Sequence, residues 1–288
     1  MRVVSPRFGF SAIAIHEPAW LLSNNWFAGT IPRKFVQHTG TRQQAISLAD
    51  EVTMAVQATK RPQRDTGCDL RNCVAVVFVS PSFVPVVAAR KYPEQERARE
   101  ESVLRAAQQF AGRLEMSACR VFGINWFCAG YVKVLSILCR SKLNLAHGKF
   151  ALVVTASRIS RITDFECKQA GALFGDIATA TLGSDSDGQR YPVRFDVLSA
   201  DAETQTAGGV FFDFHLRENV LAPSPERGKT RVPPRLVFSL DGLGIADAAP
   251  RAMSAVLYKS LATTGIVPTK YVSLYLTRPV RPSRGSRP

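Results

Sequence analysis

The sequence predicts a mixed α/β fold built around a largely internal sheet. Short runs of β-branched and aromatic residues alternate with longer amphipathic segments along the 288 residues. Hydrophobic residues make up 46% of the chain and charged residues 21%, which excludes a disordered chain, a collagen-like fibre and a coiled coil. At this length the chain has enough apolar material for a sizeable core, arranged as one large domain or two.

Eight apolar runs predict the strands. Several of them are continuous rather than alternating, which is typical of strands buried on both faces. The predicted strands cover residues 8–15, 74–80, 120–125, 150–157, 177–183, 191–200, 235–240 and 271–276.

Four amphipathic or apolar segments predict helices. In the second of these, Val103, Ala106 and Phe110 follow a spacing of three and four, which forms one apolar stripe. The predicted helices cover residues 50–60, 93–114, 128–142 and 247–264. Two polar stretches, 184–190 and the proline-rich 222–234, are predicted to be surface loops.

The chain is strongly basic, with a net charge of +14. Such a charge favours an acidic partner, which includes nucleic acid, a membrane surface and an acidic carrier protein. Four arginines and no acid fall in the last segment, 278–288, yet the remainder is also basic. No helix-turn-helix, zinc-finger or RNA-binding motif is recognisable, so we expect no nucleic-acid partner.

The six cysteines lack the spacing of a metal site. None forms a CxxC pair or a Cys/His cluster, which predicts no bound metal. Their scatter through apolar segments is typical of reduced thiols in a cytoplasmic protein. The longest apolar stretch, 74–89, is short and broken by Pro81 and Pro85, so we expect no membrane span and no signal peptide.

The segment 120–140 carries the clearest chemical signal. A predicted strand ends in a sharp turn, and Cys128 then falls in the first turn of the predicted helix, followed by the small pair Ala129 and Gly130. The positive end of a helix favours the thiolate form of such a cysteine, and backbone N–H groups of the turn can hold an oxyanion. Spacing alone leaves two interpretations open, a nucleophile and a small buried apolar side chain.

Residues 126–131, WFCAGY, resemble the nucleophile motif of β-ketoacyl-[acyl-carrier-protein] synthase III and its relatives in the thiolase superfamily. Further matches follow in the order of that family. Residues 151–157, ALVVTAS, are similar to the strand after the nucleophile helix, and 173–178, LFGDIA, are similar to its LFGDGA signature, with Ile177 in place of a glycine. Residues 38–40, HTG, resemble its RTG segment.

The resemblance implies a five-layer αβαβα fold of two pseudo-symmetric halves. It divides this chain into an N-terminal half, 1–185, which carries Cys128, and an incomplete C-terminal half, 186–277, so that the chain is truncated relative to the family. We expect the basic tail, 278–288, to lack regular structure.

The resemblance also implies an activity and partners. Cys128 takes an acyl group from an acyl-coenzyme A or acyl-carrier-protein thioester, for condensation with malonyl-carrier protein or for transfer, in fatty-acid or polyketide-like metabolism. No cofactor is bound permanently. The expected partners are acyl carrier protein and a second synthase chain, in a homodimer or a heterodimer.

Three departures from the family keep the activity open. Arg278 aligns with the family's catalytic histidine, and its catalytic asparagine has no counterpart. Arginine stays protonated and does not replace a neutral imidazole. Lys34 and His38 occupy the positions of a tryptophan and an arginine that clasp coenzyme A. The alternatives are an acyltransferase, a non-catalytic synthase subunit that pairs with an active one and, on charge alone, a nucleic-acid-binding protein.

Overall fold

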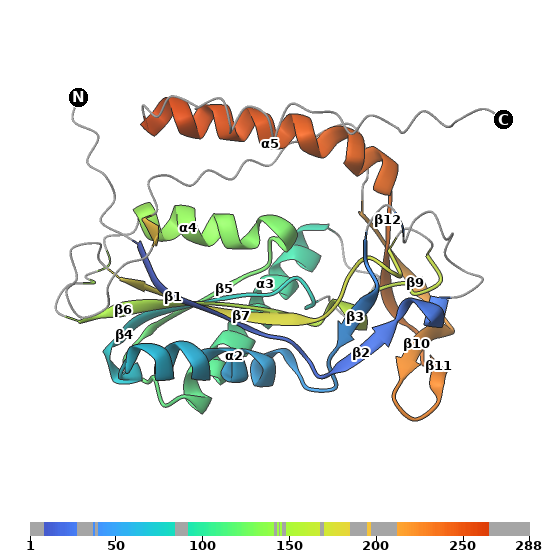
Figure 1. Ribbon diagram of the computed structural model, residues 1–288, viewed down its shortest axis with the longest axis horizontal. Coiled ribbons are helices and arrows are strands. Elements are labelled where there is room, and N and C mark those ends of the chain that lie inside the picture. The colour runs from blue at the N-terminus through green and yellow to red at the C-terminus, as the bar shows by residue number, and fades with distance from the viewer. Residues whose placement is uncertain are drawn as a thin grey trace.

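The computed structural model describes residues 9–27, 37, 40–83, 92–140, 143, 145, 148–167, 170–184, 195–196 and 212–264. Its centre is a six-stranded mixed sheet in the order β5-β4-β6-β7-β1-β8, as Figure 1 shows. The strands are β1 (Gly9–His16), β4 (Cys73–Val79), β5 (Arg120–Ile124), β6 (Phe150–Ser157), β7 (Ile177–Ser184) and β8 (Phe195–Asp196). Strands β4, β5 and β6 are parallel, whereas β7 is antiparallel to both β6 and β1. The predicted mixed α/β fold is confirmed.

Helices cover both faces of the sheet (Figure 1). On one face lie α2 (Glu51–Thr66) and α3 (Tyr92–Arg113), and on the other lies α4 (Gly130–Arg140). Alternate β4 side chains explain the arrangement, because Val76 and Phe78 join the apolar cluster beneath α2 and α3, while Val77 and Val79 join the cluster beneath α4. A strand with apolar side chains on both faces must be covered on both, as its continuous apolar run predicted.

Two helices are longer than predicted. Helix α2 continues through Pro62 to Thr66 and ends at Gly67, whose φ of +61° suits glycine. Pro62 is buried, so packing against the core outweighs the backbone hydrogen bond that a proline removes. Helix α5 (Gly242–Thr264) begins five residues earlier than predicted, where the Asp241 carboxylate accepts a hydrogen bond of 3.0 Å from the Gly244 N–H.

Three short strands outside the proline-rich stretch were not predicted. Strands β2 (Trp20–Ser23) and β3 (Gln43–Ile46) form one two-stranded ribbon, and β9 (Phe212–Arg217) pairs with β12 (Arg235–Leu240) in another. Each strand pairs with a partner about twenty residues away in the chain, so no local sequence pattern predicts the pairing. Short 3₁₀ turns complete the described elements, and these are η1 (Asn24–Phe27), η2 (Leu70–Asn72), η3 (Phe127–Ala129) and η4 (Ile159–Arg161).

The prediction of a loop at 222–234 is wrong. Strands β10 (Val220–Ser224) and β11 (Gly228–Val232) form a hairpin there. Gly228, with a φ of +67°, supplies the left-handed residue at its turn. Pro223 is tolerated because each strand of a two-stranded ribbon has one edge without a partner strand.

Several predictions fall outside the described residues. They include the strand at 271–276, the tail at 278–288, Lys34, His38 and Arg278. The division into halves at 185 stays a prediction, and of the strand at 191–200 only β8 is described. None of the helices in the described ranges is both long and apolar enough to cross a membrane.

Candidate active site

Four chain segments meet at one edge of the sheet. The parallel strands β4, β5 and β6 end there, and the antiparallel β7 begins there. The segments that follow or precede these strands are 80–83, 125–130, 157–161 and 171–176. In open α/β sheets, ligands bind outside the carboxyl ends of the strands, so this edge is the place to look for a site.

The turn after β5 holds Cys128. The strand ends at Ile124, the 3₁₀ turn η3 covers Phe127–Ala129, and α4 begins only at Gly130. Cys128 therefore lies in a tight turn two residues before α4, rather than in the first turn of the helix as predicted. The reason is Phe127, whose φ of +43° is incompatible with a right-handed helix.

The conformation of Phe127 is itself informative. A bulky residue in the left-handed region is strained by about 1–3 kcal/mol, and such strain concentrates at functional turns that the surrounding structure holds in place. The hydrogen bond from the Ala129 N–H to the Trp126 carbonyl, 3.0 Å, closes this turn. This backbone conformation was not predictable from the sequence, because phenylalanine rarely adopts it.

Gly130 allows the helix to start where it does. A Cβ at this position would lie 2.5 Å from Val79 Cγ1, at the end of β4. Only glycine lets the first residue of α4 approach that closely. The small residue after the cysteine, recognised in the sequence, therefore has a packing reason.

An apolar cavity of about 210 Å³ opens beside this turn. Aromatic rings from distant segments line it, and the ring centroids of Phe174 and Phe238 are 5.6 Å apart. Phe214 of β9 packs behind this wall, with its ring centroid 5.8 Å from that of Phe127. The sequence did not reveal the contribution of β12. The lining residues are Pro81, Phe127, Ser157, Ile159, Phe174, Gly175 and Phe238.

Asp176, in the LFGD segment, joins the chain segments at this end of the sheet by hydrogen bonds. Its carboxylate accepts hydrogen bonds from the Ser47 N–H at 2.7 Å, the Ser160 N–H at 2.9 Å and the Ser160 hydroxyl at 2.7 Å. Burial raises the pKa of Asp176, against the opposing effect of these donors. Gly175 permits the approach, because a Cβ there would lie 3.1 Å from the Ala45 nitrogen. The motif therefore has a structural role that joins three segments.

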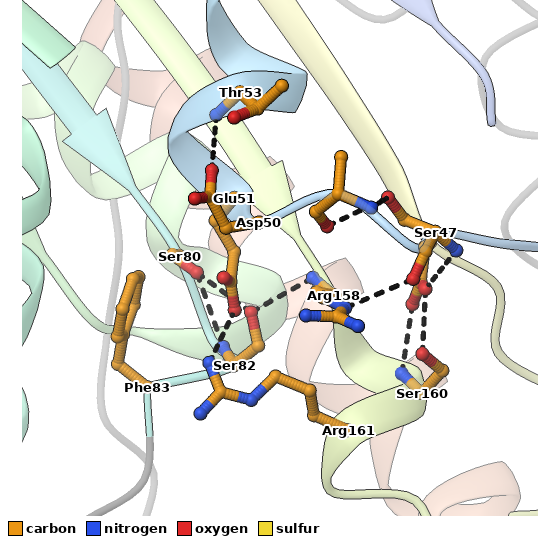
Figure 2. Close-up of polar contacts among 12 residues, drawn as sticks. Ser47, Asp50, Glu51, Thr53, Ser80, Ser82, Phe83, Arg158, Ser160 and Arg161 are labelled. Carbon is orange, nitrogen blue, oxygen red and sulfur yellow. Dashed lines mark hydrogen bonds and ion pairs between the residues drawn. The ribbon is translucent and has the colours of Figure 1, made fainter. Parts of the chain in front are cut away.

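Arg158 extends this bracing, as Figure 2 shows. Its N–H donates to the Ser82 hydroxyl at 2.9 Å and its Nε donates to the Ser47 carbonyl at 3.1 Å. Nearby, Arg161 Nη1 lies 3.3 Å from Oε1 of Glu51, which is almost fully buried. These contacts link the loops after β4 and β6 to the start of α2.

A third guanidinium joins this region. The Nε and Nη2 atoms of Arg235, at the start of β12, are buried without a hydrogen-bond partner. Burial, together with the positive charges of Arg161 and Arg158, lowers the pKa of Arg235. The unpaired donors of Arg235, beside the positive charges of Arg158 and Arg161, form a place where an anion would be stabilised. Sequence reasoning missed it, because the arginines come from segments that only the fold brings together.

His215 contacts one acidic side chain. Its Nε2 lies 3.6 Å from Asp164 Oδ2, in a contact between β9 and the loop after β6. Among the described residues, no three His, Cys, Asp or Glu side chains gather as a metal would require.

Comparisons with known proteins agree with this geometry. The sequence model of the 3-oxoacyl-[acyl-carrier-protein] synthase III family matches residues 122–202. The β-ketoacyl-[acyl-carrier-protein] synthase III of Ehrlichia ruminantium (strain Gardel) is 25% identical over 210 residues, which cover 70% of this chain and 60% of the relative. That of Oenococcus oeni is 25% identical over 253 residues, which cover 84% of this chain and 68% of the relative.

Solved structures carry the same fold. The synthase III of Aquifex aeolicus VF5 superposes with a TM-score of 0.60 at 17% identity, over 90% of this chain and 72% of that one. The priming β-ketosynthase from the R1128 polyketide pathway superposes with a TM-score of 0.60 at 20% identity, over 93% and 73%.

The chain is similar to synthase III enzymes in sequence and has the fold of the solved synthase III structures. The predicted resemblance is confirmed. This synthase III-like chain spans about three fifths of the length of the first curated relatives that it matches.

Proposed function

We propose that this protein is an acyltransferase that accepts an acyl group from a thioester onto Cys128. The supporting observation is the apolar cavity lined by Phe127, in the strained turn that also contains Cys128. An apolar cavity beside a candidate nucleophile suits an acyl chain. Its volume of about 210 Å³ lies below the ~300–1,000 Å³ of pockets for drug-sized ligands, which favours a short acyl group.

The chemistry needs a thiolate and an electrophilic carbonyl. The thiolate of Cys128 attacks the thioester carbonyl, a new carbon–sulfur bond forms, and the carrier's carbon–sulfur bond breaks. The carrier thiol leaves with the proton that Cys128 has lost. Backbone N–H groups of the turn stabilise the tetrahedral oxyanion, and the nearby start of α4 favours the thiolate.

The arginine cluster provides a way to hold the donor. Coenzyme A and the phosphopantetheine arm of a carrier protein both bring phosphate, and Arg158, Arg161 and Arg235 lie in the segments that also line the cavity or adjoin it. A net charge of +14 adds long-range attraction to an acidic acyl carrier protein, the partner we propose.

A non-catalytic subunit is the alternative, because Arg278 stands where the family has its histidine. In either case the proposed partner includes a second synthase chain, identical or not. Strand β5 is an edge of the described sheet, and a groove beside it is lined by Leu104, Phe122 and Ile137 among others. An unpaired edge flanked by apolar side chains supports pairing with a second sheet.

Intact-protein mass spectrometry tests the proposal. The chain is incubated with short, medium and long acyl-coenzyme A and acyl-carrier thioesters, and we expect a mass gain of one acyl group with the short donors. Cys128→Ala abolishes the adduct, whereas the control variant Cys167→Ala, at a free and partly buried cysteine, retains it.

The outcomes separate the two candidate functions. If the folded protein gains no acyl mass from any donor, the acyltransferase is refuted and the non-catalytic subunit is favoured. If an adduct forms, addition of malonyl-carrier protein shows whether the chain condenses the two units or only transfers the acyl group.

A further inference from the structure

Two cysteines, Cys73 and Cys119, lie at the opposite end of the sheet from the cavity. Cys73 is the first residue of β4, and Cys119 directly precedes Arg120, the first residue of β5. These strands are parallel, with Ala75 paired to Arg120, so both cysteines sit at the amino ends of neighbouring strands. Strand β4 has seven residues and spans about 20 Å, so the pair is remote from the turn that holds Cys128.

The two side chains lie on the same face of the sheet. Cys73 belongs to the apolar cluster beneath α2 and α3, Cys119 packs against that cluster, and both cysteines are free. Each thiol donates to a backbone carbonyl, at 3.2 Å from Cys73 Sγ to Ala75 and 3.0 Å from Cys119 Sγ to Met116. We propose that Cys73 and Cys119 form a reversible intramolecular disulfide.

The backbone geometry suits that bond. In a regular strand, Cys73 would point away from the face that Cys119 occupies, but β4 has an irregularity between Cys73 and Ala75, and both side chains join the same apolar cluster. Neighbouring strands lie about 4.8 Å apart and a residue advances about 3.3 Å, so regular spacing puts the two Cα atoms about 6 Å apart. That separation falls within the range of about 4.4–6.8 Å that disulfides accept.

The two thiols differ in the way that a two-step exchange requires. Cys73 is buried in the core beneath α2 and α3, whereas Cys119 is only partly buried. The neighbouring Cys73 thiol lowers the pKa of Cys119 to about 7, whereas the proximity of Cys119 and burial raise the pKa of Cys73. No charged side chain contributes to the shift at Cys119. Cys119 is therefore the accessible thiolate, and Cys73 is the resolving thiol.

The reaction is a thiol–disulfide exchange with a small disulfide such as oxidised glutathione. The thiolate of Cys119 attacks one sulfur of the oxidant, forms a mixed disulfide and releases one glutathione thiolate, which takes up a proton. Cys73 then loses its proton and attacks the Cys119 sulfur, which releases the second glutathione. Two protein thiols are oxidised to one disulfide, and one glutathione disulfide is reduced to two thiols.

Peptide mapping under non-reducing conditions tests the proposal. The full chain carries Cys128→Ala, so that the proposed nucleophile does not consume the oxidant, and it is equilibrated with oxidised and reduced glutathione at increasing ratios. We expect a linked pair of peptides containing Cys73 and Cys119, which disappears on reduction. In Cys73→Ala, glutathione instead accumulates on Cys119, because no resolving thiol remains. Cys68→Ala, at another buried cysteine of the same core, leaves the link intact.

Two results would overturn the proposal. One is the absence of the linked peptides from folded protein, or their appearance only in urea. The other comes from the alkylation rate of Cys119 against pH, a measurement that does not depend on Cys73→Ala folding. We expect half-maximal reactivity near pH 7, and a profile centred near 8.5, the ordinary value for a thiol, would show that the two thiols do not interact.

Discussion

The sheet region, residues 9–184, and the C-terminal region, residues 212–264, are held together by different forces. In the sheet region, side chains such as Val76, Val153 and Leu182 have almost no exposed surface. In the C-terminal region, Leu216, Met253 and Tyr258 are all more than half exposed. The first region rests on apolar burial on both faces of a sheet, and the second has no comparable core among its described residues.

Charged contacts attach the C-terminal region to the sheet region. Arg217 donates to Asp164 at 3.0 Å and to Glu166 at 2.8 Å, and Arg231 grips both oxygens of Glu166 at 2.9 and 3.0 Å. The aromatic wall of the cavity, centred on Phe238, adds the main apolar contact. The two regions should therefore respond differently to cavities, to pH and to salt.

The largest expected effect comes from removing a buried ring in each region. Phe110 in α3 and Phe238 in β12 are both almost fully buried. Phe110→Ala should lower the free energy of unfolding of the whole sheet region by about 3–5 kcal/mol, because the substitution leaves a void in the main core of that region. Phe238→Ala should instead release the C-terminal region and leave the main unfolding transition in place.

Urea unfolding followed by circular dichroism, with limited proteolysis in parallel, separates the two cases. We expect early cleavage within 212–240 only in Phe238→Ala. If both variants shift the main transition equally, the two regions unfold as one unit and do not differ in the way that their contacts suggest.

Asp176→Ala should have the next largest effect. It leaves the buried N–H groups of Ser47 and Ser160 without an acceptor, at a cost of about 3 kcal/mol in the free energy of unfolding. The loss falls within the sheet region, so it should appear in the main urea transition.

Asp65→Ala is the matched control, since that carboxylate is about half exposed and its ion pair with Arg61 spans one turn of α2. We expect it to leave the urea midpoint nearly unchanged. A shift for Asp176→Ala as small as that of Asp65→Ala would show that the three segments are not held by this carboxylate.

Glu166→Gln should have the smallest effect and should be confined to the C-terminal region. The hydrogen bond from Arg231, with the charges of Arg231 and Arg217, lowers the pKa of Glu166. A carboxyl with a lowered folded pKa contributes its full stability above its unfolded value of about 4.3, and this contribution is lost as the pH falls through the folded value.

Proteolysis of the hairpin β10–β11 at pH 7 and below pH 4 measures this effect. We expect cleavage to accelerate at low pH in the natural chain, and Glu166→Gln to cleave faster at pH 7 with little further change on acidification. High salt should narrow the difference at pH 7, because it screens exposed charges. Equal cleavage rates of the two proteins at pH 7 would show that the Glu166 carboxylate does not hold the C-terminal region in place.

Sequence patterns predicted the elements of the sheet region well. The run at 150–157 matches β6 residue for residue, because buried strands require continuous apolar side chains. In the C-terminal region, the run at 235–240 likewise matches β12. Prolines misled the prediction at 222–234 and at the end of α2. A proline's effect depends on whether its missing N–H would have had a partner and on what packs around it, and neither is visible in the sequence.

The site divides in the same way. Cys128, Gly130 and the LFGD segment were recognisable, because each belongs to a contiguous stretch whose residue types follow from one local turn. The left-handed Phe127, the place of Phe238 in the cavity wall, and the proximity of Cys73 and Cys119 were not recognisable. They depend on side chains that come from separate segments or on a backbone conformation held by the neighbours.

By itself, the sequence determined the main strands and helices of the sheet region, the basic charge and the cysteine in the turn after β5. These follow from local propensity, from the period of apolar residues and from composition, all of which are properties of the chain read in order. Only the tertiary structure decided which residues meet at the edge of the sheet. Such contacts depend on strand order and register, through which residues more than a hundred positions apart, such as Ser47 and Asp176, come within hydrogen-bond distance.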